Sequence, residues 1–318
     1  MIKYVYEGKR HDARTERETK MIGYLRNLKS NIDIEQFAEN VLDLSENEVE
    51  SAVRDIADEE VWVEERCNYP TSNAKEFRDR AYRDDNKRKK LRELVVKELF
   101  EFERLEDEDE TRLGKGGAKP IGSQPKDNKI CCLIIGLPAS GKSGIANVIA
   151  DKTGSYLIDS DLAKRKLPEF LKEKAGASLV HDESTEITDK LLDRCMKLGY
   201  NIVYPKIGND FDSIKNLCET FKSKGYEINL TLVGLDRKLA TQRAYNRFRE
   251  TGRYIPLSLI YDGYANDPTL TYFKMRQQES HLLSGYAHLD SNVEKGERPN
   301  VVEKEGSFIG KTKIKGGI

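Results

Sequence analysis

One stretch of the sequence, Gly136–Ser143, has residue types and a spacing suited to holding a phosphate group. It fits the pattern G-x-x-x-x-G-K-[ST] at every fixed position. Gly136 and Gly141 let the backbone wrap closely around an anion, so that its N–H groups and the next helix N-terminus point at the β-phosphate. Lys142 then reaches the β- and γ-phosphates, and the Ser143 hydroxyl is a ligand for Mg²⁺. The residues expected to bind the nucleotide are Gly136, Pro138, Ala139, Ser140, Gly141, Lys142 and Ser143.

The segments beside this loop decide whether it is a phosphate loop or a glycine-rich turn with an incidental lysine. Before it, Ile130–Ile135 is almost wholly apolar, as is typical of a strand buried on both faces of a parallel sheet. After it, apolar residues between Ile145 and Ile149 recur at helical spacing. This strand–loop–helix order favours binding of a purine triphosphate, ATP or GTP, together with Mg²⁺.

Two carboxylates come directly after the next strand-like run, residues 155–158. In a parallel sheet, Asp159 and Asp161 then lie at the edge where the loop presents the γ-phosphoryl group. Asp161 can accept the proton of an acceptor hydroxyl, and Asp159 can serve the metal ion. The alternative for each aspartate is that it merely caps the following helix.

Two arginines further along the chain have a place in the same chemistry. Arg247 lies in a helical segment, and Arg253 follows Gly252 in what we interpret as a mobile lid. Arginines brought over a nucleotide by a lid neutralise the charge that spreads over the transferring phosphoryl oxygens. The alternative is surface salt bridges with neighbours such as Glu250.

Strand-like and helical segments alternate after the phosphate loop. This alternation predicts an α/β fold of three layers with a parallel sheet, preceded by a mostly helical N-terminal domain. The further strands are expected at 155–158, 201–204 and 228–233, with helices near 185–198 and 212–224 between them.

Composition limits the class of protein without choosing a function. The chain has 318 residues, of which 34% are charged, and its net charge of -1 gives no global basic balance for nucleic acid or membrane, although local basic patches stay open. Five scattered cysteines without C-x-x-C spacing favour reduced thiols in a cytoplasmic protein. We find no signal peptide and no run of membrane-spanning length.

The region before the phosphate loop predicts a separate helical part and a connection. Ser45 with Glu48 forms a capping box ahead of apolar residues at helical spacing, and a long charged helix is expected at 74–105. An acidic block followed by glycines and prolines is typical of a flexible linker. The expected organisation is a helical accessory domain at 1–105, a linker at 106–128, a P-loop kinase domain at 129–305 and a Gly/Lys-rich tail at 306–318.

Taken together, these residues resemble the zeta toxin family of kinases over residues 129–290. The resemblance is carried by the phosphate loop, Ile158–Lys164 leading to Leu167–Phe170, Leu198–Val203, and Arg247 and Arg253 before Pro256. It implies a P-loop kinase fold and transfer of the γ-phosphoryl group of ATP or GTP to a hydroxyl of UDP-N-acetylglucosamine or a related nucleotide sugar.

The resemblance also implies roles for single residues. Lys142 matches the nucleotide lysine, Asp161 the general base, and Arg247 and Arg253 the two phosphate-clamping arginines. The residues expected to bind the acceptor are Asp161, Glu186 and Asp189. The sequence departs from the family after the next strand, at Tyr204–Gly208, where the family commonly carries an acidic residue followed by glycine and threonine.

Two other classes of function stay open: a polynucleotide or metabolite kinase, and a regulatory protein that only senses nucleotide. Zeta-type kinases are held inactive by a helical antitoxin, which is usually a separate chain. We therefore hypothesise that residues 1–105 restrain the kinase in cis, with the helix at 74–105 as the obstructing element. The alternatives are an antitoxin acting in trans, or a domain for docking or oligomerisation.

Overall fold

The computed structural model describes residues 26, 28–173, 175–294 and 297–306. The start of the chain and nearly all of the expected tail therefore lie outside the described residues. The described residues form two compact units, each built from segments that are far apart in the sequence. The first unit contains the described residues up to Ile121, Asp159–Asp193 and Arg237–Ala265, and the second contains Gly122–Ile158, Arg194–Asp236 and the described residues from Asn266 onward.

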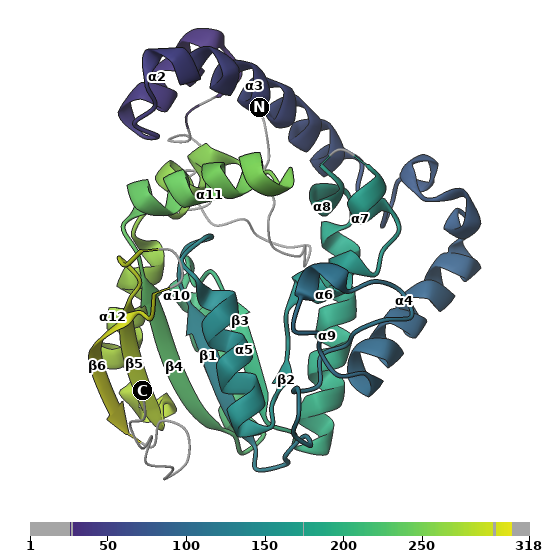
Figure 1. Cartoon of the computed structure of the whole chain (residues 1–318). Helices are drawn as coiled ribbons and strands as arrows, with labels where there is room; N and C mark the ends of the chain where they lie inside the picture. Colours follow the sequence, from purple (N-terminus) through teal and green to yellow (C-terminus); the bar gives the residue numbers. More distant parts are fainter. Residues whose placement is uncertain (1–25, 27, 174, 295–296, 307–318) are drawn as a thin grey trace. The chain divides into compact units, whose positions relative to one another are not determined.

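The second unit contains a six-stranded sheet with strand order β2-β3-β1-β4-β5-β6 (Figure 1). Strands β1 to β5 run parallel to one another, and β6 is antiparallel to β5. The prediction of an α/β fold with a parallel sheet is confirmed. Strands β5 and β6 were not predicted from the sequence. The strands are β1 (Ile130–Ile135), β2 (Tyr156–Leu157), β3 (Ile202–Lys206), β4 (Glu227–Gly234), β5 (Gly285–Asp290) and β6 (Asn300–Gly306).

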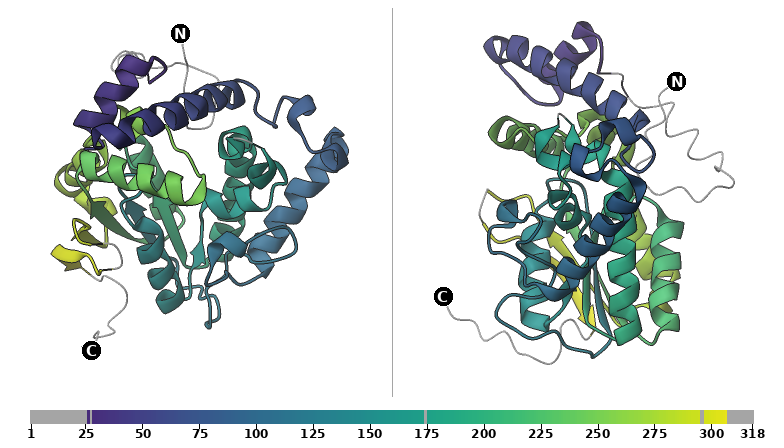
Figure 2. Two further views of the ribbon diagram at one scale, coloured as in Figure 1. Left: turned by 45° about the horizontal axis from the view of Figure 1, so that its top comes forward. Right: turned by 90° about the vertical axis from the view of Figure 1, so that its right-hand side faces the viewer.

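Helices cover both faces of this sheet and complete the three layers (Figures 1 and 2). Helix α5 (Lys142–Thr153) packs on β1, β2 and β3, whereas α10 (Phe211–Ser223) and α12 (Asp267–Gln278) pack on β4. Right-handed crossovers explain why α5 and α10 lie on opposite faces of the sheet. After β1 the chain crosses the sheet toward β2, and after β3 it crosses in the opposite direction toward β4. Cys131 and Cys132 of β1 are fully buried, in agreement with the prediction that this strand is buried on both faces.

The first unit is helical. The predicted capping box is present at the start of α3, where the backbone N–H of Ser45 donates to Glu48 Oε2 over 3.0 Å. No helix of the described residues is both long and apolar enough to cross a membrane. The helices of this unit are α2 (Asn31–Asn40), α3 (Glu46–Asn68), α4 (Asp85–Glu101), α6 (Ser160–Arg165), α7 (Glu169–Lys172), α8 (Gly176–Leu179), most of α9 (His181–Leu198) and α11 (Arg237–Thr251).

The long helix expected at 74–105 is shorter in the structure. Two 3₁₀ turns precede α4, which begins at Asp85 and ends at Glu101. The Asp84 carboxylate accepts hydrogen bonds from the backbone N–H groups of Asn86 and Lys87, both over 3.0 Å. This N-cap satisfies the first free amides of the helix and sets its start.

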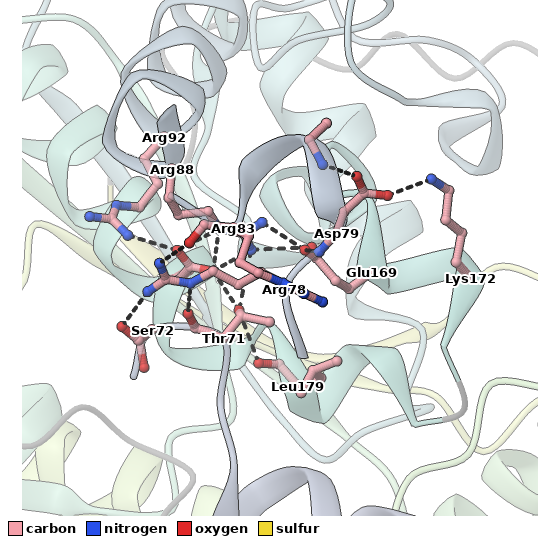
Figure 3. A network of polar contacts seen from close by, with 12 residues as sticks. Thr71, Ser72, Arg78, Asp79, Arg83, Arg88, Arg92, Glu169, Lys172 and Leu179 are labelled. Carbon is pink, nitrogen blue, oxygen red and sulfur yellow. Dashed lines mark hydrogen bonds and ion pairs between the residues drawn. The ribbon is translucent and has the colours of Figure 1, made fainter. Parts of the chain in front are cut away.

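Arg88 connects α4 to two helices that follow the phosphate loop in sequence (Figure 3). The Arg88 side chain is fully buried. Its Nη1 donates to Glu169 Oε1, at the start of α7, over 2.7 Å. Its Nε donates to Glu183 Oε1, in α9, over 2.9 Å. Thr71 completes the network by donating a hydrogen bond to Glu183. Buried charges are tolerated when each has a partner, so α4 is an integral part of this unit.

The expected flexible linker at 106–128 is ordered, and that prediction is wrong. Arg104 N donates to Lys119 O over 2.9 Å, and Lys126 N donates to Gly154 O over 2.8 Å. A Cβ atom at position 117 would lie 2.2 Å from Phe102 O, so Gly117 lets the chain return closely along the end of α4. The glycines that suggested flexibility instead permit close packing, although one boundary between the two compact units, after Ile121, lies in this stretch.

Candidate active site

The phosphate loop follows β1 in the second unit and has the backbone shape that an anion site needs. A Cβ atom at position 136 would lie 2.5 Å from Val233 O, so Gly136 is required for the close approach of β4. Gly141 has a φ of 87° and Ala139 a φ of 60°, both in the left-handed region. Successive amides in such a turn point into one concavity, which α5 extends with its own N-terminal amides.

The side chains of the loop are arranged in keeping with a phosphate site. Lys142 Nζ donates to the carbonyl oxygens of Gly136 and Leu137, over 2.7 and 2.6 Å, so the ammonium group lies across the loop. The buried Ser140 Oγ has no hydrogen-bond partner among the described residues. Ser143 is exposed in the first turn of α5. An anion-binding backbone, a lysine and a nearby hydroxyl fit the triphosphate of a nucleotide with its Mg²⁺ ion.

The position of the loop in the sheet agrees with this reading. Strands β1 and β3 are neighbours, and the helices that follow them, α5 and α10, lie on opposite faces (Figure 1). In open α/β sheets, ligands bind at the carboxyl ends of strands at such a topological switch point.

A second group of predicted residues belongs to the first unit and centres on Asp161 in α6. Lys164 Nζ donates to Asp161 Oδ1 over 2.9 Å, and Arg253 Nη2 donates to Asp161 Oδ2 over 3.1 Å. The structure thus brings the predicted base and one predicted phosphate clamp into contact. The Asp159 carboxylate accepts from the backbone N–H of Asp161 over 2.9 Å and so caps α6; its role at a metal ion stays a prediction.

The pKa values of Asp159 and Asp161 are shifted in opposite directions. Lys164 and then Arg253 hold the pKa of Asp161 well below its usual range. Burial, followed by the negative charge of Asp161, raises the pKa of Asp159 to about 6. Asp161 therefore stays ionised while Asp159 takes up the first proton on acidification.

The end of α11 delivers the two predicted arginines. The helix ends at Thr251, and Gly252, with a φ of 70°, turns the chain so that Arg253 reaches Asp161. Arg247 Nε is buried without a hydrogen-bond partner among the described residues. Burial and the nearby Arg253 charge lower the pKa of Arg247. This crowding of positive charge is favourable only with an anion nearby.

Sequence reasoning missed two residues that lie beside these arginines, Arg165 and Asp109. Arg165 in α6 forms an ion pair with Asp109, and Arg253 Nη1 lies 3.5 Å from the same Asp109 oxygen. Asp109 belongs to the acidic block that we expected to be linker. Its partners are distant in sequence, so no local pattern could have identified it.

The predicted acceptor residues on α9 have other neighbours. Glu186 accepts from Lys190 over 2.6 Å, and its other oxygen lies 3.4 Å from Arg92 Nε of α4. Asp189 is one turn further along the same helix. Their role in acceptor binding stays a prediction.

Comparison with known proteins shows which family this chain is similar to. Residues 117–269 match the model of the zeta toxin family. The predicted resemblance to zeta toxins is confirmed. The zeta toxin match includes the phosphate loop, Asp161, Arg247 and Arg253.

Among curated proteins, the toxin zeta of Enterococcus hirae is 26% identical over 123 residues, covering 36% of this chain and 43% of that protein. The toxin zeta of Streptococcus pyogenes matches to the same extent. The chain therefore spans less than half the length of these zeta toxin relatives.

Solved structures similar to this chain include one from the PezAT toxin–antitoxin system of Streptococcus pneumoniae. It has a TM-score of 0.46 and 19% identity, covering 58% of this chain and 74% of that chain. The AvrRxo1-ORF1:-ORF2 complex has a TM-score of 0.48 and 18% identity, covering 70% of this chain and 68% of that chain.

Proposed function

We propose that this protein is a zeta-type kinase that transfers the γ-phosphoryl group of ATP or GTP to a hydroxyl of a nucleotide sugar such as UDP-N-acetylglucosamine. The observation that carries the proposal is the phosphate loop, with its obligatory Gly136, its lysine and its helix N-terminus at the switch point of the sheet. The zeta toxin match supports the choice of reaction and of acceptor class.

Each residue has a defined task in the proposed reaction. The loop amides and Lys142 bind the β- and γ-phosphates, while Asp161 orients the acceptor hydroxyl and takes its proton. Arg247 and Arg253 stabilise the negative charge on the transferring phosphoryl oxygens. Ser143 and Asp159 are the groups that would hold Mg²⁺, which supplies further neutralisation of phosphate charge when bound.

A low pKa makes Asp161 a weak proton acceptor while Lys164 and Arg253 pair with it. In a kinase with a loose transition state, positioning the acceptor matters more than removing its proton early. If Arg253 turns to a phosphoryl oxygen, Asp161 loses one of its two cationic partners and its basicity rises. In the proposed reaction, the negative charge of the bound phosphoryl group thus raises the basicity of Asp161 by drawing Arg253 away from it.

The acceptor class can be tested with the purified full chain and γ-labelled ATP. Separate pools of nucleotide sugars, oligonucleotides and simple sugars are offered as acceptors, with GTP as an alternative donor. We expect label only in the nucleotide sugars. Label in oligonucleotides or simple sugars would identify a different kinase, and nucleotide binding without transfer would indicate a regulatory protein.

We also propose that the N-terminal helices restrain the kinase in cis, as a helical antitoxin would. The segment that supports this idea is α2–α3 rather than α4. Lys238 Nζ of α11 donates to Asp43 over 2.8 Å, and the Tyr254 hydroxyl donates to Glu60 over 2.6 Å. These contacts hold both ends of the element that carries Arg247 and Arg253.

Removing the whole N-terminal region is a poor test of this restraint. A protein starting at Gly122 lacks Arg88, so Glu169 and Glu183 lose a buried partner. Point variants are sharper. Glu60→Ala should raise turnover and host toxicity, whereas Glu50→Ala, on an exposed position of the same helix, should not. Equal activity of both variants and the wild type would exclude restraint through this contact.

A further inference from the structure

Two arginines of the first unit contact the Asp109 carboxylate, and the charge of a third, Arg247, also acts on it. The Arg165 guanidinium, only 6% exposed, pairs with Asp109, and Arg253 Nη1 lies 3.5 Å from the same oxygen. Arg165 lowers the pKa of Asp109 most, through its hydrogen bond, and Arg253 and Arg247 lower it further by their charge. We name Arg165, Arg247 and Arg253 the arginine cluster.

Solvent reaches the Asp109 side chain but not the side chain of its partner, Arg165. Its side chain is 66% exposed, whereas Arg165 is buried. A buried guanidinium needs an anionic partner because its hydration has been lost. Because the Asp109 carboxylate is largely exposed, it keeps much of its hydration in this pair. An anion from solution can therefore reach the position that the carboxylate occupies beside Arg165.

The segment that carries Asp109 is held at both flanks. Arg104 N donates to Lys119 O over 2.9 Å, and Arg112 N donates to Lys115 O over 3.1 Å. At its tip, the Asp107 carboxylate accepts from the Asp109 amide over 3.0 Å. Ordered backbone thus presents the Asp109 carboxylate to the arginine cluster, and the contacts of its Oδ1 atom are with Arg165 and Arg253.

Its near neighbours in the acidic block do not share this placement. Glu110 pairs instead with Lys115, and Glu108 Oε1 lies 3.7 Å from Arg104 Nη1. The contact with Arg165 and Arg253 therefore belongs to one side chain rather than to the acidic block as a whole.

We propose that the arginine cluster is a phosphoryl-binding site in which Asp109 stands in for the phosphate, and that the incoming phosphoryl group displaces it. Arg165 is then a third phosphate-binding residue, and Asp109 is a built-in competitor that lowers the affinity for substrate. The proposal rests on the proposed kinase function for the origin of the phosphoryl group. It needs only anion binding for its test.

The competition has a simple quantitative form. If the arrangement with Asp109 in place holds about nine molecules in ten, the apparent affinity for phosphate is reduced about tenfold. Asp109→Asn keeps the size of the side chain and removes its charge. It should therefore raise phosphate affinity by about this factor.

The test measures binding of inorganic phosphate by calorimetry to the full chain carrying Lys142→Ala, which weakens binding at the phosphate loop. In this background we compare Asp109→Asn with Glu110→Gln, a matched loss of charge one residue away whose carboxylate pairs with Lys115. We expect about tenfold tighter binding for Asp109→Asn and no change for Glu110→Gln. Unchanged or weaker binding by Asp109→Asn would overturn the proposal.

Two further measurements complete the design. Thermal unfolding should show that phosphate stabilises the Asp109→Asn protein more than its parent, which also verifies that the variant folds. Titration with ATP and with UDP-N-acetylglucosamine, comparing Asp109→Asn with wild type in proteins that retain Lys142, then identifies the source of the phosphoryl group as the ligand whose affinity rises. Because all readouts are of binding, the proposal can hold even if no acceptor is phosphorylated, and can fail in an active kinase.

Discussion

Arg253 Nη2 lies 3.1 Å from Asp161 Oδ2, so the predicted phosphate clamp is paired with the predicted base. The pair explains why Asp161 stays ionised, since Lys164 and Arg253 both favour its charged form. It also means that the base is weakened until the arginine finds another anion. In the proposed reaction, proton acceptance by Asp161 and phosphate binding are therefore linked through the Arg253 guanidinium.

The first prediction concerns this base. Asp161→Asn should lower kcat by about two orders of magnitude or more while leaving nucleotide affinity nearly intact, because the carboxylate acts on the acceptor. Steady-state kinetics with a separate nucleotide-binding measurement checks both parts. Wild-type turnover in this variant would show that another group receives the proton.

The second prediction concerns the phosphate loop. Lys142→Ala should abolish nucleotide binding and turnover together, since the ammonium group contacts phosphate in both the ground state and the transition state. Lys152→Ala, at an exposed position of the same helix, is the matched control and should bind normally. Calorimetric titration with ATP distinguishes the two variants. Tight binding by Lys142→Ala would remove the loop from the account.

The third prediction concerns Arg247. Arg247→Ala should lower kcat more than it raises the nucleotide KM, because the arginine compensates charge that develops in the transition state. Arg249→Ala, on an exposed face of the same helix, should leave both constants near their wild-type values. A rise in KM with unchanged kcat would instead assign Arg247 to ground-state nucleotide binding.

The fourth prediction concerns stability and pH. The folded-state pKa of Asp159 is raised to about 6, above its usual value, so ionisation of this group favours the unfolded state. Asp159→Asn should therefore be more stable than wild type above about pH 6, and the difference should vanish below the usual aspartate pKa of about 4. Melting temperatures measured across pH without added metal test this. Greater stability of the wild type at neutral pH would contradict it.

The fifth prediction concerns the buried arginine of α4. Arg88→Met should destabilise the protein by about 3–5 kcal/mol, because Glu169 and Glu183 would be left buried without it. Lys90→Met makes the same exchange of a cation for methionine on the exposed face of α4 and should cost little. Urea unfolding followed by circular dichroism gives both free energies. Equal stability of the two variants would mean that α4 is not an integral part of its unit.

The sequence predicted the parts of the fold that have local signals. The apolar run Ile130–Ile135 is β1 residue for residue, and the capping box at Ser45 begins α3. Strand β6 was missed because its exposed edge carries alternating charges and no apolar pattern. Residues 106–128 were predicted to be a flexible linker because glycines favour a flexible backbone. In the structure, Gly117 instead lets the backbone pass close to Phe102 at the end of α4.

The candidate site was predictable only in part for a similar reason. A phosphate loop is contiguous, so its chemistry is visible in eight residues. The arginine cluster is assembled from distant segments, and Asp109 acquires its meaning only beside Arg165 and Arg253. Residue types alone could name Asp161 and Arg253 but not their contact.

The most direct test of the account is mass spectrometry of UDP-N-acetylglucosamine after incubation with ATP, Mg²⁺ and the purified full chain. The account predicts a product heavier by one phosphoryl group, formed mole for mole with ADP, and lost in the Lys142→Ala protein. Release of ADP and inorganic phosphate with the nucleotide sugar unchanged would contradict it, because the site would then hydrolyse ATP without transferring to this acceptor.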